Sequence, residues 1–333
     1  MARAYRARRH KSRIKERRQM MKRLLAACAV AMCGLGSAQA FPEHAVTIVV
    51  PYAPGGVTDL YGRAIGEFLG RRWKVPVIVK NEGGAATMLG TQSVARAEPD
   101  GHTLLLTSYA YTSNPVLRKD MSYGEDALRP VMLLGNSRNL LVVPAKGELH
   151  TLDDVLAKAR KSPGNLRLAS SGMASSPHIA AELWAKAEGV QITHVPYRGT
   201  GPAMNDVLGG MVDGIFDGPS SMGNVEAGRL RAIAIASEKR HPGAPGVPTF
   251  RELGVDLVFG SWFGFFVPKG TPDAVLQQIN ADLRAAIADP ATRAAIDRTS
   301  LLVEGGTPEA FARFLDYESA RLKALVDSGV DLQ

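Results

Sequence analysis

Residues 46–59 read V-T-I-V-V-P-Y-A-P-G-G-V-T-D, and this stretch decides the fold class. Its first five residues are β-branched and almost all apolar, which predicts a buried strand that the following prolines end. The Gly55–Gly56 pair allows a tight turn, and Thr58 and Asp59 are good N-cap residues for a predicted helix over residues 60–72. A strand, a glycine turn and a helix start place free backbone N–H groups around one small volume. Such a nest binds an anion, most often a phosphate or a carboxylate.

Apolar runs typical of strands alternate with helical patterns along the rest of the chain. This alternation predicts an α/β fold with mostly parallel sheets, in which ligands bind beyond the carboxyl ends of the strands. Strand runs follow each other directly at residues 131–143 and within residues 257–267, and two such crossings are typical of two lobes with a cleft. A single doubly wound domain is the alternative that the pattern alone leaves open. Helices are predicted over residues 60–72, 85–97, 152–161, 176–187, 203–208, 272–288 and 308–326.

The first 40 residues have the features of an export signal. They hold 11 of the 40 Lys and Arg but only one of the 32 acids, so the remaining residues have 29 bases and 31 acids. The resulting net charge of −2 outside the signal argues against a nucleic-acid partner. An apolar run over residues 24–36 follows Lys22 and Arg23 and is too short to span a bilayer. Because residues 38–40 read A-Q-A, a small-x-small cleavage site, we expect residues 1–40 to be removed and a periplasmic protein to begin at Phe41.

The basic residues 1–19 leave more than one interpretation of this segment open. Translation starts at Met20 or Met21 in the first, and the preceding arginine pair belongs to a twin-arginine signal in the second. Both interpretations send the protein across the inner membrane of a bacterium; a nucleic-acid-binding arm is a third, which the adjoining apolar run disfavours. Both cysteines, Cys28 and Cys33, lie in the segment, so the mature chain is expected to have neither a disulfide nor a catalytic thiol.

Three further strand-to-helix junctions repeat the composition of the first nest. Residues 170–178 read S-S-G-M-A-S-S-P-H, residues 194–202 read H-V-P-Y-R-G-T-G-P, and residues 213–221 read D-G-I-F-D-G-P-S-S. Each alone is typical of an ordinary turn between a strand and a helix, but four together in an exported protein predict a ligand cleft. Arg198 is the one cation in these loops, where it either pairs with a second carboxylate or is a solvated side chain.

His178 also permits an enzyme hypothesis, in which the chain is an exported hydrolase. Ser171 or Ser175 would be the nucleophile, with Asp59 or Asp217 orienting the histidine. We favour the alternative that His178 supports its loop from the first turn of a helix. The chain lacks G-x-S-x-G, H-E-x-x-H, a P-loop and clustered metal-ligand spacing. We therefore expect no catalytic residue, no metal site and no cofactor.

Further motifs follow the first nest in a characteristic order. They are A-E-P-D-G-H-T-L-L at residues 97–105, N-P-V-L at 114–117, A-S-S-G-M-A-S-S-P-H at 169–178, H-V-P-Y-R-G-T-G-P-A at 194–203, L-G-G-M-V-D-G-I-F-D at 208–217, A-G-R-L-R-A-I-A at 227–234 and V-P-K-G-T-P at 267–272. In order and spacing they resemble the Bug family, the extracytoplasmic solute receptors of tripartite tricarboxylate transporters. The resemblance covers essentially the whole mature chain.

The resemblance implies a two-lobed periplasmic binding protein, type II-like, with each lobe a mostly parallel sheet flanked by helices and the ligand cleft between the lobes. Residues 41–140 with 263–333 would form the first lobe, and residues 141–262 the second. Such a receptor closes on a small organic carboxylate and delivers it, as a monomer, to the membrane permease subunits of the transporter. A solute sensor that serves a signalling partner is a further alternative.

The resemblance also implies which residues face the ligand, because the family typically holds a carboxylate with backbone amides and ordered water from the first two nests. The chain departs from the family at Val57 and Ala174, where glycine is usual, and at residues 109–112, where the family frequently has a histidine. Because the resemblance places residues 109–114 at the cleft, the identity of the ligand does not transfer. The expected ligand-binding residues are Tyr52, Ala53, Pro54, Gly55, Gly56, Val57, Thr58, Asp59, Ser108, Tyr109, Ser171, Gly172, Met173, Ala174, Ser175, His178, Tyr197, Arg198, Gly199, Asp217 and Ser220.

Overall fold

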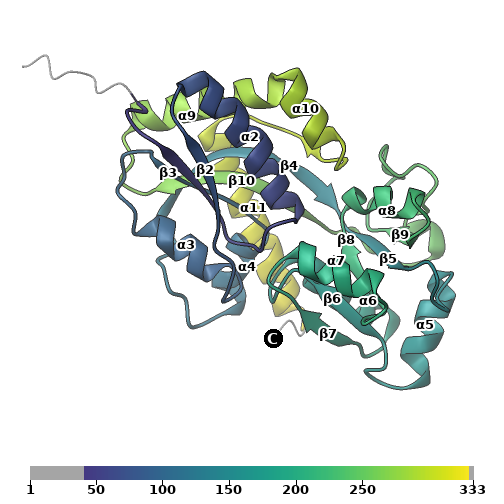
Figure 1. Cartoon of the computed structure of the whole chain (residues 1–333). Coiled ribbons are helices and arrows are strands. Elements are labelled where there is room, and N and C mark those ends of the chain that lie inside the picture. The colour runs from purple at the N-terminus through teal and green to yellow at the C-terminus, as the bar shows by residue number, and fades with distance from the viewer. Residues whose placement is uncertain (1–40, 330–333) are drawn as a thin grey trace, which may run out of the picture. The chain divides into compact units, whose positions relative to one another are not determined.

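The structure, a computed structural model, describes residues 41–329, and from His44 onward they belong to one compact unit (Figure 1). The predicted export signal and its cleavage site lie outside the described residues. Within residues 41–329, no helix is both long enough and apolar enough to cross a membrane.

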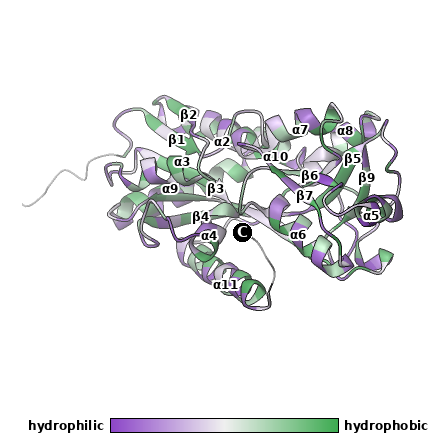
Figure 2. Ribbon diagram, turned by 90° about the horizontal axis from the view of Figure 1, so that it is seen from below, coloured by the Kyte–Doolittle hydropathy of each residue, from purple (hydrophilic) through white to green (hydrophobic). Residues whose placement is uncertain are grey.

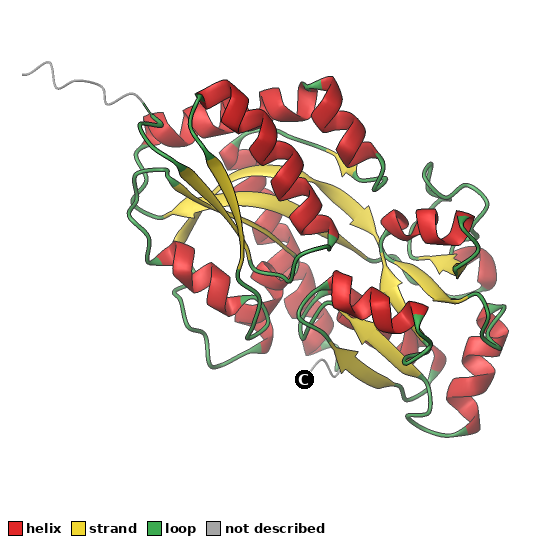
Figure 3. Ribbon diagram, in the orientation of Figure 1, coloured by secondary structure: helices red, strands yellow, loops and turns green. Residues whose placement is uncertain are grey.

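Two sheets organise the unit, and each is flanked by helices (Figure 3). The first sheet has the strand order β11-β4-β10-β3-β1-β2, and the second has the order β7-β6-β8-β5-β9. The strands are β1 (Val46–Val50), β2 (Val77–Asn81), β3 (Thr103–Ser108), β4 (Leu128–Arg138), β5 (Leu140–Pro144), β6 (Arg167–Ser170), β7 (Thr193–Pro196), β8 (Gly214–Asp217), β9 (Leu230–Ile235), β10 (Gly260–Pro268) and β11 (Leu302–Val303).

The helices cover the faces of these sheets and include every helix predicted from the sequence. They are α2 (Val57–Trp73), α3 (Met88–Ala95), α4 (Ala110–Leu117), α5 (Leu152–Lys161), α6 (Ser176–Glu188), α7 (Thr200–Leu208), α8 (Met222–Glu226), α9 (Asp273–Ala288), α10 (Pro290–Asp297) and α11 (Pro308–Asp327), with 3₁₀ turns η1 (Pro219–Ser221) and η2 (Arg251–Leu253). The short helices α4, α8 and α10 were not predicted from the sequence. In α4 the reason is Pro115, which lies inside the helix and reads as a helix breaker.

The prediction of mostly parallel sheets is wrong, because both sheets are mixed. In the first sheet β1 pairs in parallel with β2 and β3, whereas β10 runs antiparallel to both β3 and β4. In the second sheet β6 pairs in parallel with β7 and β8, whereas β5 runs antiparallel to β8 and β9. The alternation of strands and helices does not reveal this, since β10 inserts between β3 and β4 although it follows them by more than a hundred residues.

The chain passes between the two sheets twice, along neighbouring strands. It leaves the first sheet from β4 into β5 through Asn139, and it returns into β10 through Phe259. Backbone hydrogen bonds join the two passages, from Asn139 N–H to the Phe259 carbonyl at 3.1 Å and from Ala236 N–H to the Asn139 carbonyl at 2.7 Å. We propose that each sheet with its helices is one lobe, with boundaries at this double crossing. The sheets place Leu140 with the second lobe and residues 260–262 with the first, close to the predicted boundaries.

Apolar residues line the contacts between strands and helices. Figure 2 shows hydrophobic residues along the strands of both sheets and a mixture of polar and apolar residues along the helices. An aromatic cluster attaches α11 to β10, with the rings of Trp262 and Phe266 5.6 and 5.1 Å from the Phe311 ring. Gly264 lies between them and makes this approach possible, because a Cβ atom there would lie 2.2 Å from the Phe311 ring.

Candidate functional site

A central cavity of about 50 Å³ lies where strands of both sheets end at their carboxyl termini. Tyr52 follows β1, Ser108 ends β3, Ser171 follows β6 and Asp217 ends β8. At ~10–15 Å³ for each water, this volume holds on the order of four water molecules. The cavity is lined by Tyr52, Gly56, Val57, Thr58, Tyr61, Ser108, Ser137, Asn139, Ser171, Ser176, Pro177, Thr200, Asp217, Gly218, Ser220, Ser261, Phe263 and Thr299.

Three helices begin at the wall of this cavity. Val57 is the first residue of α2, Ser176 the first of α6 and Thr200 the first of α7. Figure 1 shows α2 against the first sheet and α6 and α7 against the second. The first turn of a helix leaves backbone N–H groups without partners inside the helix, and the helix dipole adds partial positive charge there. The converging helix starts therefore favour an anion in the cavity.

The charge of such an anion meets no cationic side chain at the wall. Among the described residues that line the central cavity, none is Lys or Arg, and hydroxyl groups and backbone predominate. Arg298 lines a neighbouring cavity of about 230 Å³. Arg198 lines a further cavity of about 310 Å³ and is exposed. The arrangement suits a reversibly bound anion held by N–H and O–H donors and by water.

The first nest differs in one detail from its prediction. Helix α2 begins at Val57 with Gly56 as its N-cap residue, so the expectation that Thr58 or Asp59 caps it is wrong. Asp59 instead lies one turn inside, where its Oδ2 accepts hydrogen bonds from the Gly55 N–H and the Arg63 Nε–H, both at 3.0 Å. Burial alone would raise the pKa of Asp59, but these hydrogen bonds outweigh it and lower the pKa. Asp59 thus fixes the glycine turn rather than facing the cavity.

Backbone contacts hold the first nest against the third junction. The Ala53 N–H donates to the Arg198 carbonyl at 2.7 Å, between residues that follow β1 in the first sheet and β7 in the second. The backbone at Gly201 also lies close to the first nest, because a Cβ atom at position 201 would lie 2.9 Å from the Pro54 carbonyl oxygen. These contacts connect the two halves of the site.

The second nest is built around two stacked histidines. The rings of His178 and His194 lie 3.8 Å apart and nearly parallel. His178 Nδ1 accepts the Ala174 N–H at 3.2 Å, and His194 Nε2 lies 2.6 Å from the Ser170 hydroxyl. Burial lowers the pKa of His178 to about 4 and that of His194, further depressed by its neighbour, to about 3. Both rings are therefore neutral at pH 7.

This geometry bears on the hydrolase hypothesis. The Nδ1 atom of His178 holds its own loop, as the favoured interpretation predicted, and Ser175 donates its hydroxyl to the Gly172 carbonyl at 2.6 Å. Among the hydrogen bonds of residues 41–329, none joins His178 to Ser171 or to Ser175. A nucleophile needs its base within hydrogen-bond reach, so the described site has no Ser–His pair at the predicted positions.

A buried carboxyl group forms part of the wall. Asp217 is 7% exposed. Its Oδ2 accepts a hydrogen bond from the Ser221 hydroxyl at 2.5 Å and a longer one from the Ser220 hydroxyl at 3.5 Å. Burial raises the pKa of Asp217, and the hydrogen bonds from these serines only partly offset this. At the same cavity, the Tyr52 hydroxyl bonds to the Ser108 hydroxyl at 2.7 Å, and burial raises the pKa of Tyr52. The wall therefore presents neutral hydroxyl groups and a buried carboxyl group whose pKa is raised.

The predicted site residues divide into three groups. Tyr52, Gly56, Val57, Thr58, Ser108, Ser171, Asp217 and Ser220 line the central cavity, and Gly55, Gly172, Met173, Tyr197 and Arg198 line the two neighbouring cavities. The remainder line none of these three: Ala53, Pro54, Asp59, Tyr109, Ala174, Ser175, His178 and Gly199. Tyr109 lies in the core instead, fully buried with its ring 5.2 Å from Phe259.

Several cavity residues were missed by sequence reasoning. Ser137 and Asn139 lie at the crossing from the first sheet to the second, and Ser261 lies at the return crossing. Tyr61 reaches the cavity from inside α2, where its hydroxyl bonds to Thr299 at 2.7 Å. Small polar residues beside the two predicted crossings were the available signal for the first three. Nothing in the local sequence indicates that Thr299 lies beside α2.

Comparisons with known proteins agree with this architecture. The family model described as "Tripartite tricarboxylate transporter family receptor" matches residues 62–329. The protein BugT of Bordetella pertussis is 32% identical over 94% of this chain and 99% of its own length. The solved periplasmic binding protein BugD is 31% identical with a TM-score of 0.83, covering 88% of this chain and 100% of that one.

Two further solved structures contain small dicarboxylates. MatC of Rhodopseudomonas palustris, solved with bound malate, is 30% identical with a TM-score of 0.82 and covers 86% of this chain and 100% of its own. A second R. palustris protein, solved with adipate, is 29% identical with a TM-score of 0.81 and covers 86% of this chain and 97% of its own. These neighbours share the two-lobed periplasmic binding protein fold, so the predicted fold class is confirmed.

Proposed function

Because the chain belongs to the tripartite tricarboxylate transporter receptor family, we propose that it is a periplasmic receptor that captures a small organic carboxylate and delivers it to the membrane permease of such a transporter. The neighbours in this family are substrate-binding receptors rather than enzymes, in agreement with the expectation of no catalytic residue. The receptor acts as a monomer in this proposal.

The observation that carries the proposal is the convergence of three helix starts on one cavity. The first residues of α2, α6 and α7 come from both sheets, so a single bound anion contacts both halves of the site. A ligand that contacts both halves stabilises the closed arrangement over any open one. The permease can then distinguish the loaded receptor from the empty one by its shape.

The ligand class is a carboxylate, most simply a dicarboxylate of about the size of malate. The relatives solved with malate and adipate support this class. We propose that the starts of α2 and α6, with Ser171, hold one carboxylate group. Ser108, Asp217 and Ser220 then contact the other end of the ligand, whereas Asp59 and His178 support the two nests from behind.

Calorimetry with a panel of ligands tests this function. Mature protein is titrated with succinate, malate, citrate, adipate, acidic amino acids, benzoate and inorganic phosphate, and the ligand is afterwards recovered and analysed. We expect 1:1 binding of at least one carboxylate, recovered unaltered, and no binding of phosphate. If the wild type converts a ligand and His178→Ala does not, the receptor proposal is contradicted. It is also contradicted if no carboxylate in the panel binds.

Export with cleavage after Ala40 is part of the same proposal and has its own test. N-terminal sequencing of the protein from a periplasmic fraction is expected to begin at Phe41. A cytoplasmic protein that keeps residues 1–40 contradicts this part without affecting the binding test.

A further inference from the structure

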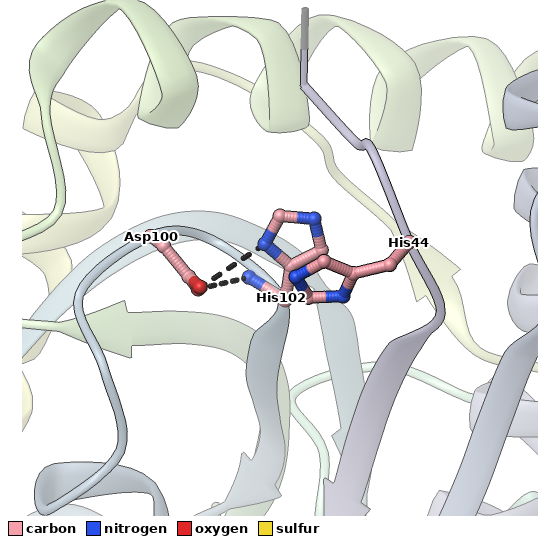
Figure 4. A group of neighbouring side chains, drawn as sticks. All are labelled: His44, Asp100 and His102. Atoms are coloured by element: carbon pink, nitrogen blue, oxygen red, sulfur yellow. Dashed lines mark hydrogen bonds and ion pairs between the residues drawn. The ribbon is translucent and has the colours of Figure 1, made fainter. Parts of the chain in front are cut away.

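A cluster of two histidines and an aspartate lies at the opposite end of the first sheet from the central cavity. His44 precedes β1, and Asp100 and His102 form the turn that precedes β3 (Figure 4). Because β1 and β3 are parallel neighbours, their amino-terminal ends meet at one edge, away from the carboxyl ends that form the ligand site. The receptor function therefore makes no use of these three side chains.

The side chains are arranged around one small volume. A ligand atom from each of the three residues lies within 4.8 Å of the others. The rings of His44 and His102 are stacked 3.7 Å apart, and Asp100 Oδ1 lies 3.3 Å from His102 Nδ1. Figure 4 shows the Asp100 carboxylate facing the His102 ring, with the His44 ring beside it. Two ligands on a tetrahedral zinc ion, with bonds of about 2.0–2.2 Å, lie about 3.3–3.5 Å apart, close to the separation of Asp100 Oδ1 and His102 Nδ1. An imidazole nitrogen binds a metal along its ring plane, so the exposed His44 ring has to turn out of the stack to bind the same ion.

The backbone holds the cluster in position, and the tautomer of one ring is fixed. His44 Nδ1 lies 3.2 Å from the Ala45 carbonyl oxygen, which can only accept, so Nδ1 carries the proton and Nε2 keeps its lone pair. A metal-ligating histidine commonly has this kind of hydrogen bond on its other nitrogen. The Asp100 carboxylate also accepts the His102 N–H at 2.8 Å, and the His102 carbonyl accepts the Thr47 N–H at 2.8 Å. The turn before β3 is thus tied to β1.

We propose that His44, Asp100 and His102 bind a divalent transition-metal ion, with Zn²⁺ as the best fit, and so clip the entry of β1 to the entry of β3. Two imidazoles and one carboxylate suit zinc and its neighbours, whereas Mg²⁺ and Ca²⁺ require an oxygen-rich set. Water completes the coordination, because His44 and Asp100 are exposed. The prediction from sequence spacing that the chain has no metal site is revised by this proposal, since residues 44 and 102 come together only through β1 and β3 pairing.

The test uses the untagged mature protein after treatment with a chelator. Titration with ZnCl₂ is expected to give one site of micromolar affinity and a rise in thermal midpoint of several degrees, with no response to MgCl₂. His44→Ala and His102→Gln should each weaken zinc binding at least tenfold, and Asp100→Asn about tenfold. His150→Ala is the matched control, because it removes an exposed histidine from the other half of the molecule and should leave zinc binding unchanged.

A second readout distinguishes a built site from scattered surface binding. Co²⁺ is expected to give visible absorption bands typical of low-coordinate nitrogen and oxygen ligation, and these bands should be lost in His44→Ala. Circular dichroism of that variant checks the fold, which an exposed side chain should leave unchanged. Equal zinc affinity in wild type, His44→Ala and His102→Gln overturns the proposal, and so does zinc binding that His150→Ala weakens as much as His44→Ala does.

Discussion

Asp217 is the residue whose protonation bears most directly on ligand binding. It lines the central cavity, and burial raises its pKa. A negative carboxylate ligand and a negative Asp217 in one small cavity repel each other, whereas a protonated Asp217 donates a hydrogen bond to the ligand. Ser220 and Ser221 donate hydrogen bonds to the ionised carboxylate of Asp217, and these bonds limit the rise in its pKa.

We predict that carboxylate affinity rises as the pH falls from 8 toward 5. Because burial raises the pKa of Asp217, the group takes up its proton at a higher pH than an exposed aspartate does, and one proton taken up with each ligand changes affinity by up to about tenfold per pH unit. Asp217→Asn should flatten the profile, because an amide cannot titrate. Calorimetry with malate across this range measures both proteins, and a wild-type affinity that is independent of pH contradicts the prediction.

Asp59 is a second single residue with a testable role, in the stability of the fold. Replacing Asp59 by Ala removes the hydrogen bonds from Gly55 and Arg63 and should lower the free energy of unfolding by about 1–3 kcal/mol. Since its folded pKa is lowered, Asp59 stabilises fully above its unfolded pKa, and this contribution is lost as the pH falls through the folded value. Urea denaturation at pH 7 and pH 3 should therefore show a smaller difference between wild type and Asp59→Ala at pH 3.

The matched variant for this prediction is Asp59→Asn, which keeps an oxygen that accepts from Gly55 but loses the charge that pairs with Arg63. It should be destabilised less than Asp59→Ala at pH 7. Equal stability of wild type and Asp59→Ala at pH 7 would falsify the assignment of Asp59 as the support of the first nest.

At the scale of elements, the helix starts rather than side-chain charges define the site. Helix α2 presents Gly56, Val57 and Thr58 to the cavity, and α6 and α7 present their first residues to it. The sequence motifs predicted the nests at α2 and α6 because a strand, a small-residue turn and a helix start follow each other there. The junction at residues 194–202 was also predicted to face the cleft, through Tyr197, Arg198 and Gly199, but it is Thr200, the first residue of α7, that lines the central cavity, and the start of α7 was predicted three residues late.

A proline substitution isolates the backbone donor at the start of α2. Val57 is the first residue of the helix, where proline is tolerated but has no N–H group. We predict that Val57→Pro weakens carboxylate binding about tenfold or more with little loss of thermal stability. Val57→Ala keeps the N–H group and should bind within about threefold of wild type; equal binding by both variants argues against a backbone donor at this position.

At the scale of the whole molecule, the two halves of the site meet closely around Gly201. A Cβ atom there would lie 2.9 Å from the Pro54 carbonyl oxygen, a backbone atom that cannot move independently of the nest. Gly201→Ala is therefore expected to oppose closure and weaken ligand binding about tenfold, which corresponds to about 1.4 kcal/mol. Thermal unfolding without ligand should change little.

Gly223→Ala is the control for this variant, because Gly223 also lies in a helix but its Cβ atom would meet nothing within 4 Å. Small-angle scattering adds a direct measure of closure, in which saturating ligand should compact the wild type more than Gly201→Ala. Unchanged affinity in Gly201→Ala would show that the contact between Gly201 and Pro54 is not part of the bound state.

The sequence by itself determined all the longer helices, the nests and the resemblance to the family, but not the short helices α4, α8 and α10. β-Branched runs, helix caps and glycine turns are local signals, so β1, α5 and the turn at residues 51–56 could be predicted from neighbouring residues alone. The tertiary structure decided what depends on distant pairing: the antiparallel insertion of β10, the place of Thr299 beside Tyr61, and the burial of Tyr109 in the core. It also decided which nest residues face the cavity and which support it, because side-chain direction follows from packing between segments far apart in the chain.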